Sequence, residues 1–136
     1  MQYTIGQIAG IINGKGLLAS PDNRITRLLT DSRSLSFPEE TLFFAIRTRH
    51  GDGHRYIGEL YRKGVRDFVV TQAEGLKEYK DANFIVVKDS TAALQTLAAH
   101  HRSQFDIPVV GITGSDGKTI VKEWLHHLVT GNYNAV

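Results

Sequence analysis

The most informative stretch of the sequence is Val109-Val110-Gly111-Ile112-Thr113-Gly114-Ser115-Asp116-Gly117-Lys118-Thr119. A short apolar run leads into glycines, then into Lys-Thr, and an amphipathic helical pattern follows. This order predicts a strand, a phosphate-binding loop and a helix, because a glycine backbone can turn its N–H groups toward an anion and a helix N-terminus adds positive partial charge. Lys118 would face the outer phosphates, and the Thr119 hydroxyl is placed to ligate Mg²⁺.

The spacing of the glycines is unusual for such a loop. The general pattern G-x-x-x-x-G-K-[ST] needs glycine at position 112, where this chain has Ile112. Gly111, Gly114 and Gly117 instead follow one another at every third position. The alternative is a glycine-rich turn without a ligand. Gly-Lys-Thr between an apolar run and a helical pattern favours the phosphate loop.

Composition and charge exclude several classes of protein. The 136 residues suffice for one domain with a core, and 41% apolar with 22% charged residues is ordinary for a globular protein. A net charge of +2 without a long basic run gives no reason to expect nucleic-acid binding, although it suits an anionic small molecule. The absence of cysteine excludes disulfides and thiolate chemistry and fits a reducing compartment. Neither a leader-like N-terminus nor a membrane-spanning run is present, so we expect a cytoplasmic protein without membrane insertion.

Apolar strand patterns alternate with helical patterns along the chain, which predicts an α/β fold. A capping-box pattern at Thr4 and Gln7 opens the first helix, and Ser90 is positioned to cap a long one. The last helix carries an apolar stripe through Trp124 that would normally pack on a sheet. The predicted helices are residues 4–14, a helix through Ile57 to Tyr61, a helix from Ser90 and the one after Thr119; the predicted strands are residues 17–19, 25–29, 41–46, 65–70, 84–87 and the run after Pro108.

The phosphate loop lies late in the chain. A nucleotide-binding sheet needs several strands after this loop, and a Mg²⁺ site normally takes an acidic partner from one of them. We therefore expect a piece of a longer protein: a complete first domain, residues 1–106, followed by the opening unit of a second, residues 107–136. The boundary is expected between Ser103 and Pro108, where a helix ends and a proline restarts the chain.

Two polar loops after apolar strands form a second candidate site. Asp31-Ser32-Arg33 follows one strand and the basic, glycine-rich segment from Arg47 to His54 follows the next. Ligands of α/β proteins tend to lie at strand carboxyl ends, and arginine forks suit phosphate or carboxylate. Solvated turns with surface arginines explain these residues equally well. His50, Asp52 and His54 alternate like metal ligands, but the glycines between them make a flexible loop rather than a preorganised metal site.

These stretches together resemble the Mur ligases, which build the peptide of the bacterial cell-wall precursor. The residues that carry the resemblance are Thr30 to Arg33, Leu42 to Ile46, Asp52-Gly53-His54, Gly64 and the phosphate loop, in the order and approximate spacing of that family. The chain looks most like the members that add D-alanyl-D-alanine to UDP-N-acetylmuramoyl-tripeptide, with a form fused to an alanine racemase as a variant of that assignment.

The resemblance implies a fold, two sites and a reaction. Residues 1–106 would be the domain that holds the uridine diphosphate end of the precursor, a mixed sheet with helices, and residues 107–136 the first strand, phosphate loop and helix of the ATP-binding domain. The family transfers the γ-phosphate of ATP to the precursor's carboxylate, and the incoming amine attacks the acyl phosphate. The chain alone would bind ligand but not ligate.

The implied site residues follow the family motifs. Carried over by motif position, they are Asp31, Ser32, Arg33, Arg49, His50 and Gly51 at the uridine diphosphate; Thr113, Gly114, Ser115, Asp116, Gly117, Lys118 and Thr119 at the ATP phosphates; Lys118 and Thr119 as the catalytic groups; and Thr119 on Mg²⁺.

Two residues depart from the family pattern. Asp116 stands where the loop usually has Asn or Ser, and a carboxylate beside ATP phosphates is repelled unless it is compensated. We therefore expect weaker ATP binding than with Asn. Thr48 stands where the family often has Gly after a basic residue, so this loop departs from the family pattern at that position.

Three other readings remain open at the level of sequence. Another ligase of the family would add a diamino acid, since the residues that select the amino substrate lie mostly beyond Val136. A folate-polyglutamate ligase has a similar phosphate loop, but the Asp-Ser-Arg loop argues against it. A non-catalytic nucleotide-sugar binding module is disfavoured by the intact Lys118 and Thr119.

Overall fold

The computed structural model describes residues 2–49 and 51–133. The chain divides into two compact units, Met1–Phe105 and Asp106–Val136, which are described here one at a time.

A five-stranded mixed sheet forms the centre of the first unit, with the strand order β2-β7-β6-β5-β4. Strands β4 (Arg27–Leu29), β5 (Thr41–Phe44), β6 (Asp67–Val70) and β7 (Asn83–Val86) are parallel, and β2 (Lys15–Leu17) joins the β7 edge antiparallel. A separate antiparallel pair joins β1 (Tyr3–Thr4) to β3 (Arg24–Ile25). The predicted α/β fold with a mixed sheet is confirmed.

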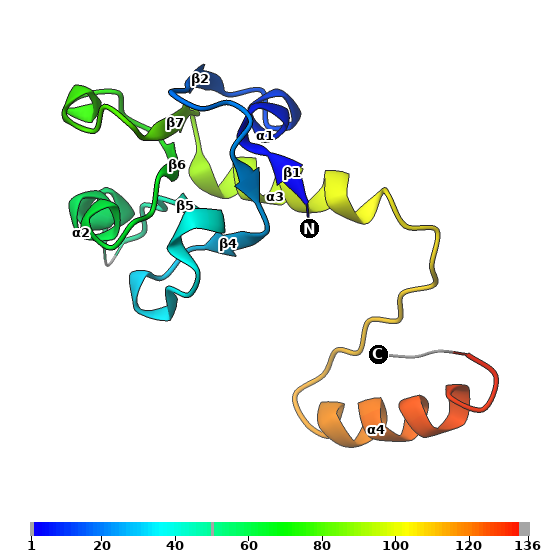
Figure 1. Ribbon diagram of the computed structural model, residues 1–136. Helices are drawn as coiled ribbons and strands as arrows, with labels where there is room; N and C mark the ends of the chain where they lie inside the picture. Colours follow the sequence, from blue (N-terminus) through cyan, green and yellow to red (C-terminus); the bar gives the residue numbers. More distant parts are fainter. Residues whose placement is uncertain (1, 50, 134–136) are drawn as a thin grey trace. The chain divides into compact units, whose positions relative to one another are not determined.

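Helices cover both faces of this sheet (Figure 1). Helices α1 (Ile5–Ile11) and α3 (Ser90–Arg102) pack on one face, and α2 (Ile57–Arg62) packs on the other. Successive strand side chains point to opposite faces, so Phe44 contributes to the α1 and α3 side and Phe43 to the α2 side. This explains why the sequence of β5 is apolar throughout: both of its faces are buried.

The short elements are 3₁₀ turns that link the strands. They are η1 (Ser32–Ser34), η2 (Pro38–Glu40), η3 (Gly53–Tyr56) and η4 (Leu76–Glu78). The crossover from β6 to β7 contains η4 and no α-helix, and its buried Leu76 packs into the core on the α2 side.

Helix α1 begins as the sequence predicts. The Thr4 hydroxyl accepts from the Gln7 N–H at 3.2 Å, and the Gln7 side chain accepts from the Thr4 N–H at 2.9 Å. The helix ends at Ile11 rather than Gly14, because Asn13 adopts a left-handed conformation with φ of 50°.

The prediction that Ser90 caps the long helix is wrong. Asp89 is the N-cap of α3, and its carboxylate accepts from the N–H groups of Thr91 (2.7 Å) and Ala92 (3.1 Å). Both residue types favour this position. Ser90 is the first helical residue instead, and its buried hydroxyl has no hydrogen-bond partner within the described part of the chain.

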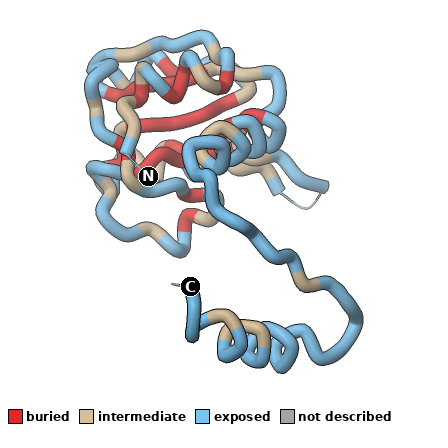
Figure 2. The backbone as a smooth tube through the Cα atoms, turned by 90° about the vertical axis from the view of Figure 1, so that its right-hand side faces the viewer, coloured by how far each residue is buried: buried red, intermediate tan, exposed pale blue. Residues whose placement is uncertain are grey.

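The second unit consists of an extended segment, the phosphate loop and helix α4 (Lys118–Val129). The predicted strand after Pro108 is not assigned, since a strand is defined by its pairing and no strand lies beside it within the described residues of this unit. The apolar stripe of α4 is exposed, with Trp124 67% accessible, and Figure 2 shows that the buried residues belong to the first unit.

Candidate nucleotide-binding site

The two polar loops of the first unit lie at the same edge of the sheet. Strands β4 and β5 are parallel neighbours, with Leu29 opposite Phe43, so their carboxyl ends point the same way. The Asp31–Arg33 loop follows β4 directly, and the loop that begins at Arg47 follows β5. The structure therefore brings together two segments that the sequence separates.

The Asp31–Arg33 loop is held by contacts within itself. The Asp31 carboxylate caps η1 by accepting from the Arg33 N–H at 3.0 Å. The Arg33 guanidinium donates to the same carboxylate from Nε (3.0 Å) and from Nη2 (2.7 Å). The Arg33 side-chain bond, with help from its backbone N–H, lowers the pKa of Asp31 to about 2. An exposed ion pair of this kind contributes little to the free energy of unfolding. A ligand that took the place of Asp31 on Arg33 would therefore reduce the stability of the fold only slightly.

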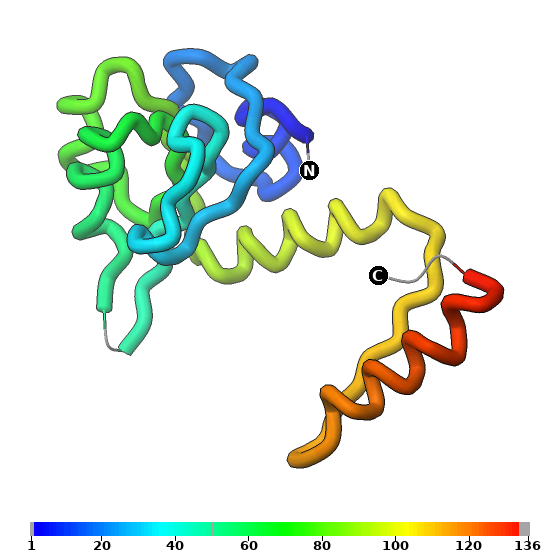
Figure 3. Tube along the Cα trace, turned by 60° about the horizontal axis from the view of Figure 1, so that its bottom comes forward, coloured from blue at the N-terminus to red at the C-terminus, as the bar shows by residue number. Residues whose placement is uncertain are grey.

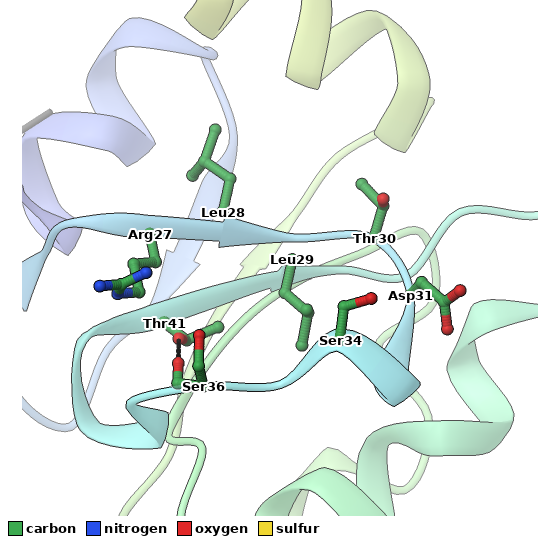
Figure 4. A pocket seen from close by; sticks show the side chains of 8 residues that line it. All are labelled: Arg27, Leu28, Leu29, Thr30, Asp31, Ser34, Ser36 and Thr41. Carbon is green, nitrogen blue, oxygen red and sulfur yellow. Dashed lines mark hydrogen bonds between the residues drawn. The ribbon is translucent and has the colours of Figure 1, made fainter.

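A hollow of about 270 Å³ adjoins this loop (Figure 4). Thr30 and Asp31 line one end of it, and the Ser36–Thr41 segment lines the other, where the Thr41 hydroxyl donates to the Ser36 carbonyl at 3.1 Å. The Arg27 guanidinium, also in the lining, stacks over the Phe37 ring at 4.4 Å. Polar groups at both ends of a concave surface fit a polar ligand better than an apolar one.

The loop after β5 is a hairpin that extends from the sheet edge (Figure 3). Arg47 and Asp52 form an antiparallel bridge, and the Thr48 N–H donates to the Gly51 carbonyl at 2.8 Å. Arg49 and Gly51 are exposed on this hairpin. His50, the remaining residue predicted here, lies outside the described residues.

The base of the hairpin is tied to the sheet by an aspartate and a histidine. Asp52 accepts from the Arg47 guanidinium (2.8 and 3.0 Å), from the His54 N–H (3.0 Å) and from His54 Nδ1 (2.5 Å). These donors, the His54 N–H foremost, hold the pKa of Asp52 well below its usual range. His54 Nε2 accepts from the Thr71 N–H at 3.0 Å.

Two residues near this edge escaped the sequence reasoning. Thr71 follows β6, the third parallel strand, and the rule that ligand loops follow strand carboxyl ends would have drawn attention to it. Tyr56, the last residue of η3, is 43% exposed, and its electrostatic effect adds slightly to that of Asp31 in raising the pKa of the Arg33 guanidinium.

In the second unit the phosphate loop has the backbone that its glycines permit. Gly114 and Gly117 have positive φ values of 147° and 72°, which other residues rarely adopt. The Lys118 ammonium folds back to the carbonyls of Gly114 and Ser115. Lys118 and Thr119 line a hollow of about 320 Å³ together with Val110, Ile112 and Lys122.

These residues fit a bound phosphate chain. Helix α4 begins at Lys118 without any side-chain cap, so its first N–H groups are available to an anion. Two lysines line the adjoining hollow. For Mg²⁺ the loop offers the Thr119 hydroxyl, and residues 2–49 and 51–133 contain no cluster of three or more His, Cys, Asp or Glu that could hold a metal.

Comparison with known families identifies the chain. Residues 24–102, which contain both polar loops of the first unit, match the Mur ligase family, catalytic domain. The chain belongs to the Mur ligase family.

Individual Mur ligases match most of the chain. The UDP-N-acetylmuramoyl-tripeptide–D-alanyl-D-alanine ligase of Synechocystis is 38% identical over 85% of the chain and 27% of its own length. The UDP-N-acetylmuramoyl-L-alanyl-D-glutamate–2,6-diaminopimelate ligase of Clostridioides difficile is 35% identical over 93% of the chain and 25% of its own length. This Mur ligase chain thus spans about a quarter of the length of either relative.

Solved structures agree with this assignment. A crystal structure of MurF from Acinetobacter baumannii superposes with a TM-score of 0.81 at 27% identity, over 97% of this chain and 28% of that one. A second crystal structure of MurF from Acinetobacter baumannii gives a TM-score of 0.82, and the UDP-N-acetylmuramoylalanyl-D-glutamyl-2,6-diaminopimelate–D-alanyl-D-alanyl ligase of the same organism gives 0.81. None of the helices in the described part of this Mur ligase chain is long and apolar enough to cross a membrane.

Proposed function

We propose that this chain is part of a cytoplasmic, ATP-dependent Mur ligase that adds D-alanyl-D-alanine to UDP-N-acetylmuramoyl-tripeptide in peptidoglycan synthesis. Residues 1–106 would form the domain that binds the uridine diphosphate end of the precursor. Residues 107–136 would begin the ATP-binding domain.

The main support for the proposal is that the two polar loops lie at the same edge of the sheet. The Asp31–Arg33 loop follows β4, and the hairpin with Arg49 and Gly51 follows β5, its parallel neighbour. Arginine forks recognise phosphate oxygens in a bidentate manner, while the Asp31 carboxylate and the Ser32 hydroxyl offer groups for a base or ribose. Arg33 would exchange its bond to Asp31 for the diphosphate.

The phosphate loop supports the ATP half of the proposal. Its N–H groups and Lys118 would hold the phosphates of ATP, with Thr119 on Mg²⁺. Lys118 and the loop amides would offset the charge that develops as the γ-phosphoryl group passes to the precursor's carboxylate. In the protein that contains this chain, the amine substrate would then attack the acyl carbon, form the amide bond and release inorganic phosphate.

The choice of amino substrate rests on relatives alone. The Synechocystis relative at 38% identity is a D-alanyl-D-alanine ligase, as the Acinetobacter MurF structures are, but a diaminopimelate ligase follows at 35%. A ligase that adds a diamino acid is therefore the second candidate. Activity of the longer protein with each amine would separate the two.

Calorimetric titration of the 136-residue chain with UDP-N-acetylmuramoyl-tripeptide and with UDP tests the proposal that residues 1–106 bind the precursor. We expect both ligands to bind and Arg33→Ala to lose about tenfold or more in affinity, since a charge-assisted bidentate contact contributes about 1.5–3 kcal/mol. Arg62→Ala is the matched control, because Arg62 is an exposed arginine on α2 whose guanidinium donates to the Gly58 carbonyl of its own helix. Wild-type chain that binds neither ligand would contradict the proposal.

A further inference from the structure

His54 connects the hairpin to a strand that the hairpin does not follow. The hairpin leaves the sheet after β5, whereas Thr71 lies at the carboxyl end of β6. The His54 side chain is 13% exposed and lies between them, with Nε2 on the Thr71 N–H (3.0 Å) and Nδ1 on Asp52 (2.5 Å).

The Thr71 contact fixes the tautomer of this histidine. A backbone N–H can only donate, so Nε2 must carry its lone pair and the ring proton must be on Nδ1. Nδ1–H then donates to Asp52, a carboxylate that can only accept. The same Asp52 accepts from the Arg47 guanidinium across the bridge that closes the hairpin. One line of hydrogen bonds therefore runs from the end of β6 to both arms of the hairpin.

The backbone of the hairpin is closely packed at Gly53, beside this histidine. The Gly53 N–H donates to the Ile46 carbonyl at 2.9 Å. A Cβ on Gly53 would lie 2.8 Å from the Ile46 nitrogen and 2.9 Å from the Ala45 Cα. The two hairpin arms thus lie in close backbone contact at Gly53, next to His54.

We propose that His54, as its neutral Nδ1–H tautomer, is a positioning residue for nucleotide binding: its bond to the Thr71 N–H fixes the hairpin that carries Arg49 and Gly51, at the sheet edge where the Asp31–Arg33 loop also lies. This inference rests on the proposed function, in which these loops hold the uridine diphosphate. His54 itself need not touch the ligand. It acts by preorganising the arm that does.

Two isosteric variants separate the two bonds of His54. The oxygen of His54→Gln reaches the place of Nε2 and can accept from Thr71, whereas His54→Asn reaches only the place of Nδ1 and can donate to Asp52. We expect the Kd for UDP to rise about tenfold in His54→Asn and to stay within about threefold in His54→Gln, since only the latter retains the anchor to β6. His127→Leu, which removes an exposed histidine of α4, is the control.

The readouts distinguish positioning from a purely structural role. UDP affinity is measured by calorimetry at a temperature where circular dichroism shows every variant folded, and Mg-ATP affinity is measured alongside and is expected to be unchanged. The imidazole ¹⁵N resonances of wild-type His54 are expected to show Nδ1 protonated and Nε2 unprotonated.

Two kinds of result from these measurements would overturn the inference, and they differ in what they imply for the proposed function. Folded Asn and Gln variants that bind UDP equally well, or an Nε2-protonated ring, would overturn the inference while leaving the proposed function standing. A wild-type chain that fails to bind UDP would instead overturn the proposed function and the inference with it.

Discussion

Asp67 is a fully buried carboxylate at the start of β6, and its two oxygens have different partners. Oδ1 accepts from the Asn83 amide at 2.7 Å and Oδ2 from the Asn23 amide at 3.1 Å. Burial raises the pKa of Asp67 above 3.8, although both amides oppose the shift. The proton is therefore bound more tightly in the folded chain than in the unfolded one, so this group's contribution to stability falls as the pH rises through and above 3.8.

We expect Asp67→Asn to destabilise the first unit by about 1–3 kcal/mol at pH 4, because an amide can accept from only one of the two asparagines. The deficit relative to wild type should shrink toward neutral pH, since the variant has no carboxylate to ionise in the core. Urea unfolding at several pH values measures both effects. Asp22→Asn, at an exposed aspartate, should change neither; a deficit that grew with pH would refute this account.

Gly53 and Gly51 form a natural pair for testing the hairpin. An added Cβ at Gly53 meets the backbone of Ala45 and Ile46 within 3.0 Å, whereas at Gly51 it meets nothing within 4 Å. We expect Gly53→Ala to cost about 1–3 kcal/mol, as overpacking against immobile backbone does, and Gly51→Ala to be nearly neutral in stability. Denaturant unfolding of both variants checks the difference, and equal stabilities would show that the hairpin is not closed at Gly53.

Asp116 lies in the phosphate loop without any hydrogen bond that would compensate its charge beside phosphates within the described contacts. We expect Asp116→Asn to tighten Mg-ATP binding about fivefold, which corresponds to about 1 kcal/mol of relieved repulsion near a protein surface. Titration of the protein with Mg-ATP measures it, with Glu74→Gln, at an exposed glutamate of the first unit, as a charge-matched control. Unchanged affinity in Asp116→Asn would mean that the carboxylate is turned away from the phosphates.

At the level of elements, helix α1 shows how far local sequence determines structure. Its capping box was predictable because both partners lie within one turn of the chain. We expect Thr4→Ala to cost about 1 kcal/mol by removing the cap, and Gly10→Ala to gain about 0.5–1 kcal/mol, because Gly10 is exposed, helical and has open space at its Cβ. Thermal unfolding of both variants tests this pair, and a stabilised Thr4→Ala or a destabilised Gly10→Ala would contradict it.

Other element boundaries could not be predicted from the sequence, because they depend on which of several residues or strands is placed to make a contact. Asp89 and Ser90 are both residue types that favour the N-cap position. Which of them caps α3 depends on the position at which the chain leaves β7 and enters the helix. The run after Pro108 has a strand's composition, but pairing requires a neighbour, which composition cannot supply. The strand predicted at residues 17–19 forms instead at Lys15–Leu17, where it pairs antiparallel with β7.

At the scale of the molecule, alternating apolar and helical patterns were sufficient to predict the α/β class, because buried parallel strands must be apolar on both faces. The motifs were sufficient to indicate the family. The meeting of the β4 and β5 loops required the strand order, and the Thr71–His54–Asp52 line required side-chain positions, so neither could be read from the sequence.

The most direct measurement of the central claim is a UDP titration of the ¹⁵N-labelled chain followed by amide chemical shifts. The account predicts that the largest changes occur at Asp31 to Arg33 and at Thr48 to His54, with α1 and α4 almost unaffected. Saturable changes centred on another surface, or no changes at millimolar UDP, would contradict the assignment of this sheet edge as the nucleotide site.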